Sequence, residues 1–158
     1  MTTSQPGARR TALVLAFAAG GVLSAPRPAR AALGDSLASI QSDQAHLQGS
    51  LRTAPMEGYL LHEIQAPTGT VVREFSSPAG AVFGVSWEGP FLPDLHRILG
   101  PSYDSYVEAA RAGRRGRGPL ILHLQNLVFE SAGHPRGFHG RAYIPQLLPE
   151  GVPAEAVR

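Results

Sequence analysis

The sequence predicts an α+β domain in which helices cover one antiparallel sheet or two packed sheets. Residues 58–88 and 120–144 each contain short strand-like segments separated by hairpin-length turns, which is typical of antiparallel meanders and not of βαβ units. An apolar stripe at helical spacing precedes the first group, and two short helical segments separate the groups. These observations predict two three-stranded meanders, an N-terminal helix and a central helical pair.

An export signal is predicted ahead of this domain, over residues 1–31. Arg9 and Arg10 precede an uncharged apolar run, and the small-residue motif Ala29-Arg30-Ala31 follows it, which is the order of a bacterial signal peptide. The apolar run is shorter than the roughly 20 residues that a membrane span needs. We therefore expect cleavage near Ala31 and a periplasmic or secreted mature chain without a stable membrane span. An uncleaved anchor is the alternative.

The charge balance changes once this leader is set aside. The chain has 14 arginines, no lysine and 12 acidic residues, but four arginines lie in the leader and all the acids follow it. The mature chain therefore carries 10 arginines against 12 acids, a net charge of −2, which argues against nucleic acid as a partner. There is no cysteine, so we expect no lipoprotein anchor and no disulfides, and the fold must be stabilised by packing alone.

The mature chain is expected to begin with an amphipathic helix, within residues 32–54. Leu37, Ile40, Leu47 and Leu51 follow one another at spacings that place them on a single helical stripe. Packing of this stripe on the sheet is the expected role, and partner binding is the alternative. The polar side of the helix has no basic cluster, which argues against binding to anionic lipid.

The single α+β domain is expected to occupy residues 55–148. Its first meander has strands at 59–64, 70–75 and 81–87, because Pro and Gly occupy favourable turn positions between them. By period-two alternation, one face of the third strand carries the side chains of Ala81, Phe83, Val85 and Trp87.

Two short helices, 94–99 and 103–111, are expected to lead into the second meander. Its strands are 120–124, 127–131 and 137–144, and their leucines, Phe129 and Ala142 share one face. The opposite face carries polar side chains, which are those of His123, Glu130, His139, Arg141 and Tyr143. The proline-rich tail, 149–158, is expected to be irregular.

Several sequence blocks across the mature chain carry a resemblance. They are GTVVREF (69–75), SPAGAVF (77–83), VSWEGPFLPDL (85–95), YVEAA (106–110), GRGPL (116–120), LVFES (127–131) and GRAY (140–143). With these blocks the chain resembles a family of exported proteobacterial proteins of unknown function. The resemblance implies an exported single domain and carries over no catalytic or binding residue.

The strongest candidate for chemistry is a metal site on the polar face of the second meander. In the expected register, Glu130 and His139 are cross-strand neighbours, with His123 nearby on the same face. Two imidazoles and one carboxylate can form a catalytic zinc site. The alternative is a solvated face on which Glu130 pairs with Arg141.

Two weaker candidates lie elsewhere. Glu88 and Asp94 are paired carboxylates of the kind that could hydrolyse a cell-wall glycoside, although Asp94 also suits the first turn of a helix. Another hypothesis is that the basic loop and the end of the preceding helix bind an anion through Arg111, Arg114, Arg115 and Arg117. The alternative is that these residues form a solvated linker.

The sequence contains no nucleophile elbow and no cofactor loop, so no cofactor is expected. It therefore favours a non-enzymatic exported domain that binds a protein, a glycan or another component of the cell envelope. Strand addition at an exposed sheet edge is a plausible mode of binding. The alternative is a cell-envelope hydrolase, either metal-dependent or metal-free.

Overall fold

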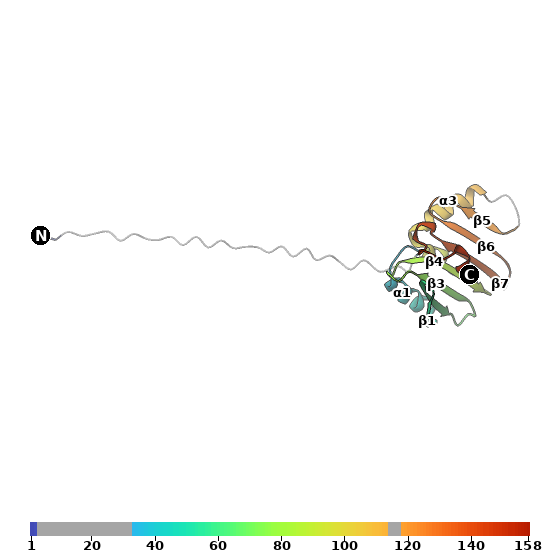
Figure 1. The fold of residues 1–158 in the computed structure, drawn as a ribbon, viewed down its shortest axis with the longest axis horizontal. Helices are drawn as coiled ribbons and strands as arrows, with labels where there is room; N and C mark the ends of the chain where they lie inside the picture. The colour runs from blue at the N-terminus through green and yellow to red at the C-terminus, as the bar shows by residue number, and fades with distance from the viewer. Residues whose placement is uncertain (3–32, 114–117) are drawn as a thin grey trace.

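The computed structural model describes residues 1–2, 33–113 and 118–158, and Figure 1 shows their arrangement. Within these ranges, seven strands form one antiparallel sheet in the order β1-β2-β3-β4-β7-β6-β5. The strands are β1 Ser50–Met56, β2 Tyr59–Gln65, β3 Val71–Ser76, β4 Val82–Gly89, β5 Leu120–His123, β6 Val128–His134 and β7 Gly137–Tyr143. The α-helices are α1 Leu37–Leu47, α2 Leu95–Leu99 and α3 Tyr103–Gly113.

The α+β class and the helical pair between the two groups of strands are confirmed. The prediction of two three-stranded meanders is wrong in one respect: in the described chain the first meander has four strands, β1 to β4. The second meander, β5 to β7, has the predicted three strands. The two meanders join where β4 pairs with β7, so the chain builds one continuous sheet.

The additional strand replaces the end of the expected N-terminal helix. Helix α1 stops at Leu47, and Gln48 adopts a left-handed φ of 51°. A Cβ atom on Gly49 would lie 2.7 Å from Ile64 Cγ2 and 2.9 Å from the carbonyl oxygen of Gln65, so only glycine lets the chain pass this close to β2. Leu51 fitted the helical period but faces the same core from β1. The prediction that the helix includes Leu51 is therefore wrong.

A β-bulge changes the face of one predicted core residue. Phe75 pairs with Gly84 but Ser76 pairs with Val82, so an extra residue is inserted in β4. Phe83 consequently packs with Phe75 on one face of the sheet, whereas Val85 and Trp87 pack on the other. The prediction that Phe83 shares a face with Val85 and Trp87 is wrong for this reason.

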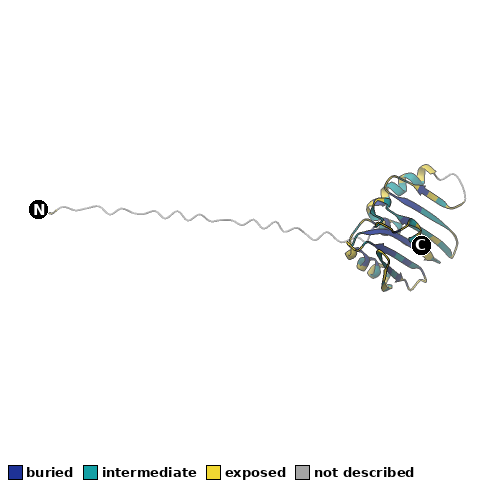
Figure 2. Cartoon of the chain, in the orientation of Figure 1, coloured by how far each residue is buried: buried dark blue, intermediate teal, exposed yellow. Residues whose placement is uncertain are grey.

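The helix face of the sheet, defined as the side that packs against α1, α2 and α3, holds the larger core. Ile40 of α1 and Ile98 of α2 pack there against sheet residues that include Val85, Trp87 and Phe129. The predicted apolar face of the second meander is confirmed, because Leu122, Phe129 and Ala142 belong to this core. Figure 2 shows that burial is greatest along the central strands.

The opposite side, here called the tail face, is partly covered by the C-terminal residues. The tail predicted to be irregular forms a 3₁₀ turn, Ala154–Ala156, and lies against the sheet. Val152 and Val157 are buried with Phe75 and Phe83, and the lack of a Cβ on Gly84 makes room for Val157. The tail therefore completes a second, smaller core and leaves the other half of this face open, from Arg73 on β3 across to Ile121 on β5.

Most of the predicted leader lies outside the described residues, which resume at Leu33. Among the helices that the structure does describe, none has the length and apolar character needed to cross a membrane.

Candidate functional site

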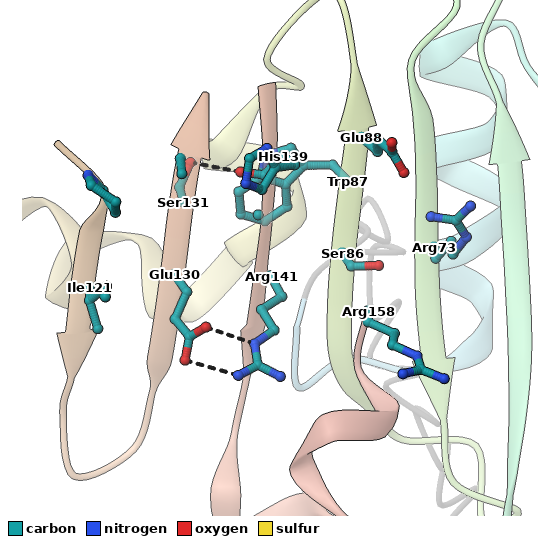
Figure 3. Close-up of a pocket in the computed structure, with 13 residues that line it drawn as sticks. Arg73, Ser86, Trp87, Glu88, Ile121, Glu130, Ser131, His139, Arg141 and Arg158 are labelled. Atoms are coloured by element: carbon teal, nitrogen blue, oxygen red, sulfur yellow. Dashed lines mark hydrogen bonds and ion pairs between the residues drawn. The ribbon is translucent and has the colours of Figure 1, made fainter. Parts of the chain in front are cut away.

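The open half of the tail face contains a pocket of about 410 Å³. It extends across β3, β4, β7, β6 and β5, and Arg158 of the tail reaches its edge (Figure 3). Alternation along the strands points one side chain in two toward it. The pocket lining includes Arg73, Ser86, Glu88, Ile121, Glu130, Ala132, His139, Arg141 and Arg158.

Ser86 lies at the centre of this pocket and is only 3% exposed. Its neighbours across the two adjacent strands are Arg73 on β3 and Arg141 on β7. The Ser86 hydroxyl has no hydrogen-bond partner among the described residues. A buried hydroxyl without a partner is unfavourable and uncommon in folded proteins.

The two arginines beside Ser86 differ in how many of their donors are engaged. Arg141 donates from Nε and Nη2 to the Glu130 carboxylate, at 2.9 and 3.0 Å, and from Nη1 to the carbonyls of Ala154 and Val157. Arg73 donates only from Nε, to Glu63 Oε2 at 3.0 Å. Within the described chain, Arg158 has no hydrogen bond or ion pair, so the free donors lie on Arg73 and Arg158.

The sequence suggested an ion pair between Glu130 and Arg141 as the alternative to a metal site, and the structure contains this pair. The hydrogen bonds from Arg141, together with its charge, hold the pKa of Glu130 below its ordinary value. The same partner raises the pKa of Arg141. The pair therefore remains charged across the physiological pH range and fixes the tail to the sheet.

The predicted metal ligands share a face, but their register differs from the prediction. Glu130 lies opposite Arg141, whereas His139 lies opposite Ala132 and His123 opposite Val128. The shift arises because β6 continues to His134 and turns within two residues, with Arg136 at a left-handed φ of 72°. The prediction that Glu130 and His139 are direct neighbours is wrong. In the described ranges, no group of three histidine or acidic side chains is placed to hold a metal ion.

The two predicted catalytic carboxylates have different surroundings. Glu88 lines the pocket at the end that also holds His139. Asp94 is the N-cap of α2, and its Oδ1 accepts hydrogen bonds from the backbone N–H groups of His96 and Arg97. Of the candidate anion-binding residues, Arg114, Arg115 and Arg117 lie outside the described residues.

A buried ionisable cluster on the helix face was missed at the sequence level. Asp43 of α1 and Glu74 of β3 are 2% and 3% exposed, and Arg97 of α2 donates to Asp43 at 3.3 Å. A signal was present, because Asp43 lies three residues after Ile40 and four before Leu47, on the apolar stripe. Glu74 likewise lies two residues after Val72, and both side chains are on the same buried side of β3.

These two carboxyls interact with each other away from solvent. Burial raises the pKa of Glu74 well above its ordinary value, and the charge and hydrogen bonding of Asp43 raise it further. Burial also raises the pKa of Asp43, while its hydrogen bonds to Glu74 and Arg97 oppose that shift. Burial therefore favours the protonated form of Glu74, and neither of its carboxyl oxygens has a hydrogen-bond partner among the described residues. Both side chains are buried between α1 and the sheet. This position is consistent with a role in packing the helix on the sheet and not with ligand binding.

Comparison with known protein families gives a match over residues 29–157 to a family described as protein of unknown function (DUF2844). The chain belongs to the DUF2844 family. The expected membership of a family of unknown function is thereby confirmed for this DUF2844 domain. Searches of curated proteins and of solved structures gave no match.

Proposed function

We propose that this DUF2844 protein is an exported, non-enzymatic proteobacterial domain that binds a component of the cell envelope through the open half of its tail face. The observation that carries the proposal is the pocket around Ser86, where a buried hydroxyl and arginine donors have no partner in the described chain. Donors that the protein leaves unsatisfied are the groups that a bound partner would use.

The positions of the candidate reactive groups support binding over catalysis. Asp94 uses its carboxylate to cap α2, and Glu130 uses both of its carboxylate oxygens to hold Arg141. Among the described residues that line the pocket, Glu88 therefore has no second carboxylate free to act with it, and glycoside hydrolysis normally uses two. The predicted leader at residues 1–31 supports export, and the family match begins at residue 29, within the last three residues of that leader.

Affinity capture with a matched pair of variants tests the proposal. Ala132→Trp places an indole in the pocket, whereas Ala112→Trp makes the same change at an exposed position on α3. The purified chain and both variants are immobilised and exposed to envelope extract, and the retained material is identified by mass spectrometry. We expect the original chain and Ala112→Trp to retain the same component, unaltered, and Ala132→Trp to lose it.

Equal retention by all three proteins, or no retention by any, would contradict the proposed binding face. Chemical alteration of the retained component would contradict the non-enzymatic part of the proposal.

A further inference from the structure

We infer that the tail-face pocket binds a small amphiphile, with its anionic carboxylate or phosphate head against Ser86 and its aliphatic body along β6 and β5. This inference rests on the proposed binding function and specifies the chemistry of the ligand.

The buried hydroxyl of Ser86 marks where the head binds. Ser86 is on the central strand β4, is almost fully buried and has no partner in the described ranges, yet its side chain points into the pocket. An oxygen atom of a bound ligand would accept its hydrogen bond and remove the unfavourable isolation of the hydroxyl.

The groups around Ser86 determine the charge of that head. Arg73 lies directly across from Ser86, and its terminal nitrogens have no partner in the described chain. Arg158 lies near Arg73, and its guanidinium group also has no hydrogen bond or ion pair with a described residue. Guanidinium groups bind carboxylate and phosphate oxygens with paired hydrogen bonds. Arg141 adds positive charge but has its donors engaged by Glu130 and the tail. An anionic head is therefore complementary to this end of the pocket.

Acidic groups in the pocket restrict where an anion can bind. The charge of Glu130 is balanced by the two hydrogen bonds from Arg141. Glu88 is two residues from Ser86 along β4, at the His139 end, and has no salt bridge within the described ranges. An anion is thus repelled from the Glu88 end and attracted to the end with Arg73 and Arg158.

The remainder of the pocket favours an apolar body. Ile121 on the edge strand β5 is 59% exposed, and Ala132 and Pro119 line the same region. Because β4 and β5 are three strand spacings apart, Ile121 lies roughly 14 Å from Ser86. A ligand that contacts both ends must therefore be elongated, and its body would cross the Glu130–Arg141 pair, in which the two charges neutralise each other.

The size of the site favours a free small molecule over a membrane surface. A pocket of about 410 Å³ falls within the range of roughly 300–1,000 Å³ that is typical of small-molecule sites. Arg158 of the tail lines the pocket at one end, so a guanidinium group borders the site there.

Isothermal titration calorimetry of the purified chain with decanoate, below the concentration at which it forms micelles, tests the inference. We expect saturable binding at one site per chain, similar binding of decyl phosphate, and affinities at least tenfold weaker for decanol, acetate and inorganic phosphate. Decanol that binds as tightly as decanoate would overturn the anionic head. Acetate that binds as tightly would overturn the apolar body.

Variants assign the binding to this pocket. Ser86→Ala and Arg73→Gln are each expected to weaken decanoate binding at least tenfold, whereas Arg52→Gln, an exposed arginine on β1, should leave it unchanged. Without ligand, Ser86→Ala should raise Tm, because it removes an unsatisfied buried hydroxyl. A serine that is merely structural would instead lower Tm when replaced. Unchanged decanoate binding in both Ser86→Ala and Arg73→Gln would overturn the inference.

The two proposals fail separately. If no amphiphile binds but Ala132→Trp still abolishes capture of an envelope component, the ligand class is wrong and the binding function stands. If neither amphiphile binding nor pocket-dependent capture is observed, both are wrong.

Discussion

At the scale of single residues, the buried acid pair under α1 is the most unusual feature of the helix face. Asp43 and Glu74 have little access to water, and Arg97 supplies the neighbouring positive charge. Retaining a proton on this pair in the folded state links its stability to pH. His62, which is also buried and hydrogen-bonded to Thr53 and Ser76, has a pKa lowered by burial.

The raised pKa of Glu74 predicts a stability loss at higher pH. Between the ordinary value of 4.5 and the raised folded value, the folded chain holds a proton that the unfolded chain releases. The free energy of unfolding should therefore fall as pH rises through this window. Glu74→Gln removes the titration and should exceed the original chain in stability by about 1–3 kcal/mol at pH 8.

Urea unfolding from pH 4 to pH 8 measures this effect, with the exposed Glu57→Gln as control. The account predicts that the stability difference between Glu74→Gln and the original chain grows with pH. A difference that is independent of pH would show that the carboxyl does not retain its proton in the folded state.

The glycine at position 140 is a second residue-scale constraint. A Cβ atom there would lie 2.4 Å from Trp87 Cζ2 and 2.6 Å from the carbonyl oxygen of Glu130. Because Trp87 is buried and the carbonyl belongs to β6, neither can move freely. Gly140→Ala should lower the free energy of unfolding by about 1–3 kcal/mol. Gly118→Ala, where a Cβ would meet nothing within 4 Å, should have little effect in the same denaturation experiment.

At the scale of elements, the strands bounded by clear turns were predictable and the departures had local causes. Pro and Gly at 66–69 and 77–80 marked the hairpins that the structure contains. The β1 strand was hidden because Leu51 satisfies both a helical period and a strand pairing with Ile64. The bulge beside Phe83 could not be inferred, since alternation alone does not reveal where an extra residue enters a strand.

The C-terminal tail is an element whose role depends on packing and not on regular structure. Val157 is fully buried in the tail-face core, between Gly84 and the aromatic side chains. Val157→Ala should lower the free energy of unfolding by about 2 kcal/mol. Val107→Ala, at a half-buried position on α3, should cost less in the same urea titration. Equal losses would indicate that the tail is not held against the sheet.

At the scale of the whole molecule, one sheet has two differently covered faces. The helices cover one face, while the tail covers only part of the other and leaves the pocket around Ser86. The sequence predicted the polar face with Glu130, His139 and Arg141, because these residues alternate along adjacent strands. It did not indicate Ser86, Arg73 or Arg158 as site residues, since β4 lies beside the polar face of β7 only after the two meanders join, and the tail reaches the pocket only in the folded chain.

Export is a prediction that concerns the whole chain. The leader predicts that the mature protein begins near residue 32 and is recovered outside the cytoplasm. Intact-mass analysis of the protein from fractionated cells should give the mass of residues 32–158. Recovery of the full-length chain from the cytosol would contradict both the leader and the envelope location of the proposed ligand.

The central claim is that the open half of the tail face is a binding site. Amide chemical-shift mapping of the ¹⁵N-labelled chain, titrated with decanoate, tests it most directly. We expect saturable shifts clustered at Arg73, Ser86, Arg141 and Arg158, with α1 and α2 unaffected. Shifts confined to the helix face, or no saturable shifts at all, would contradict it.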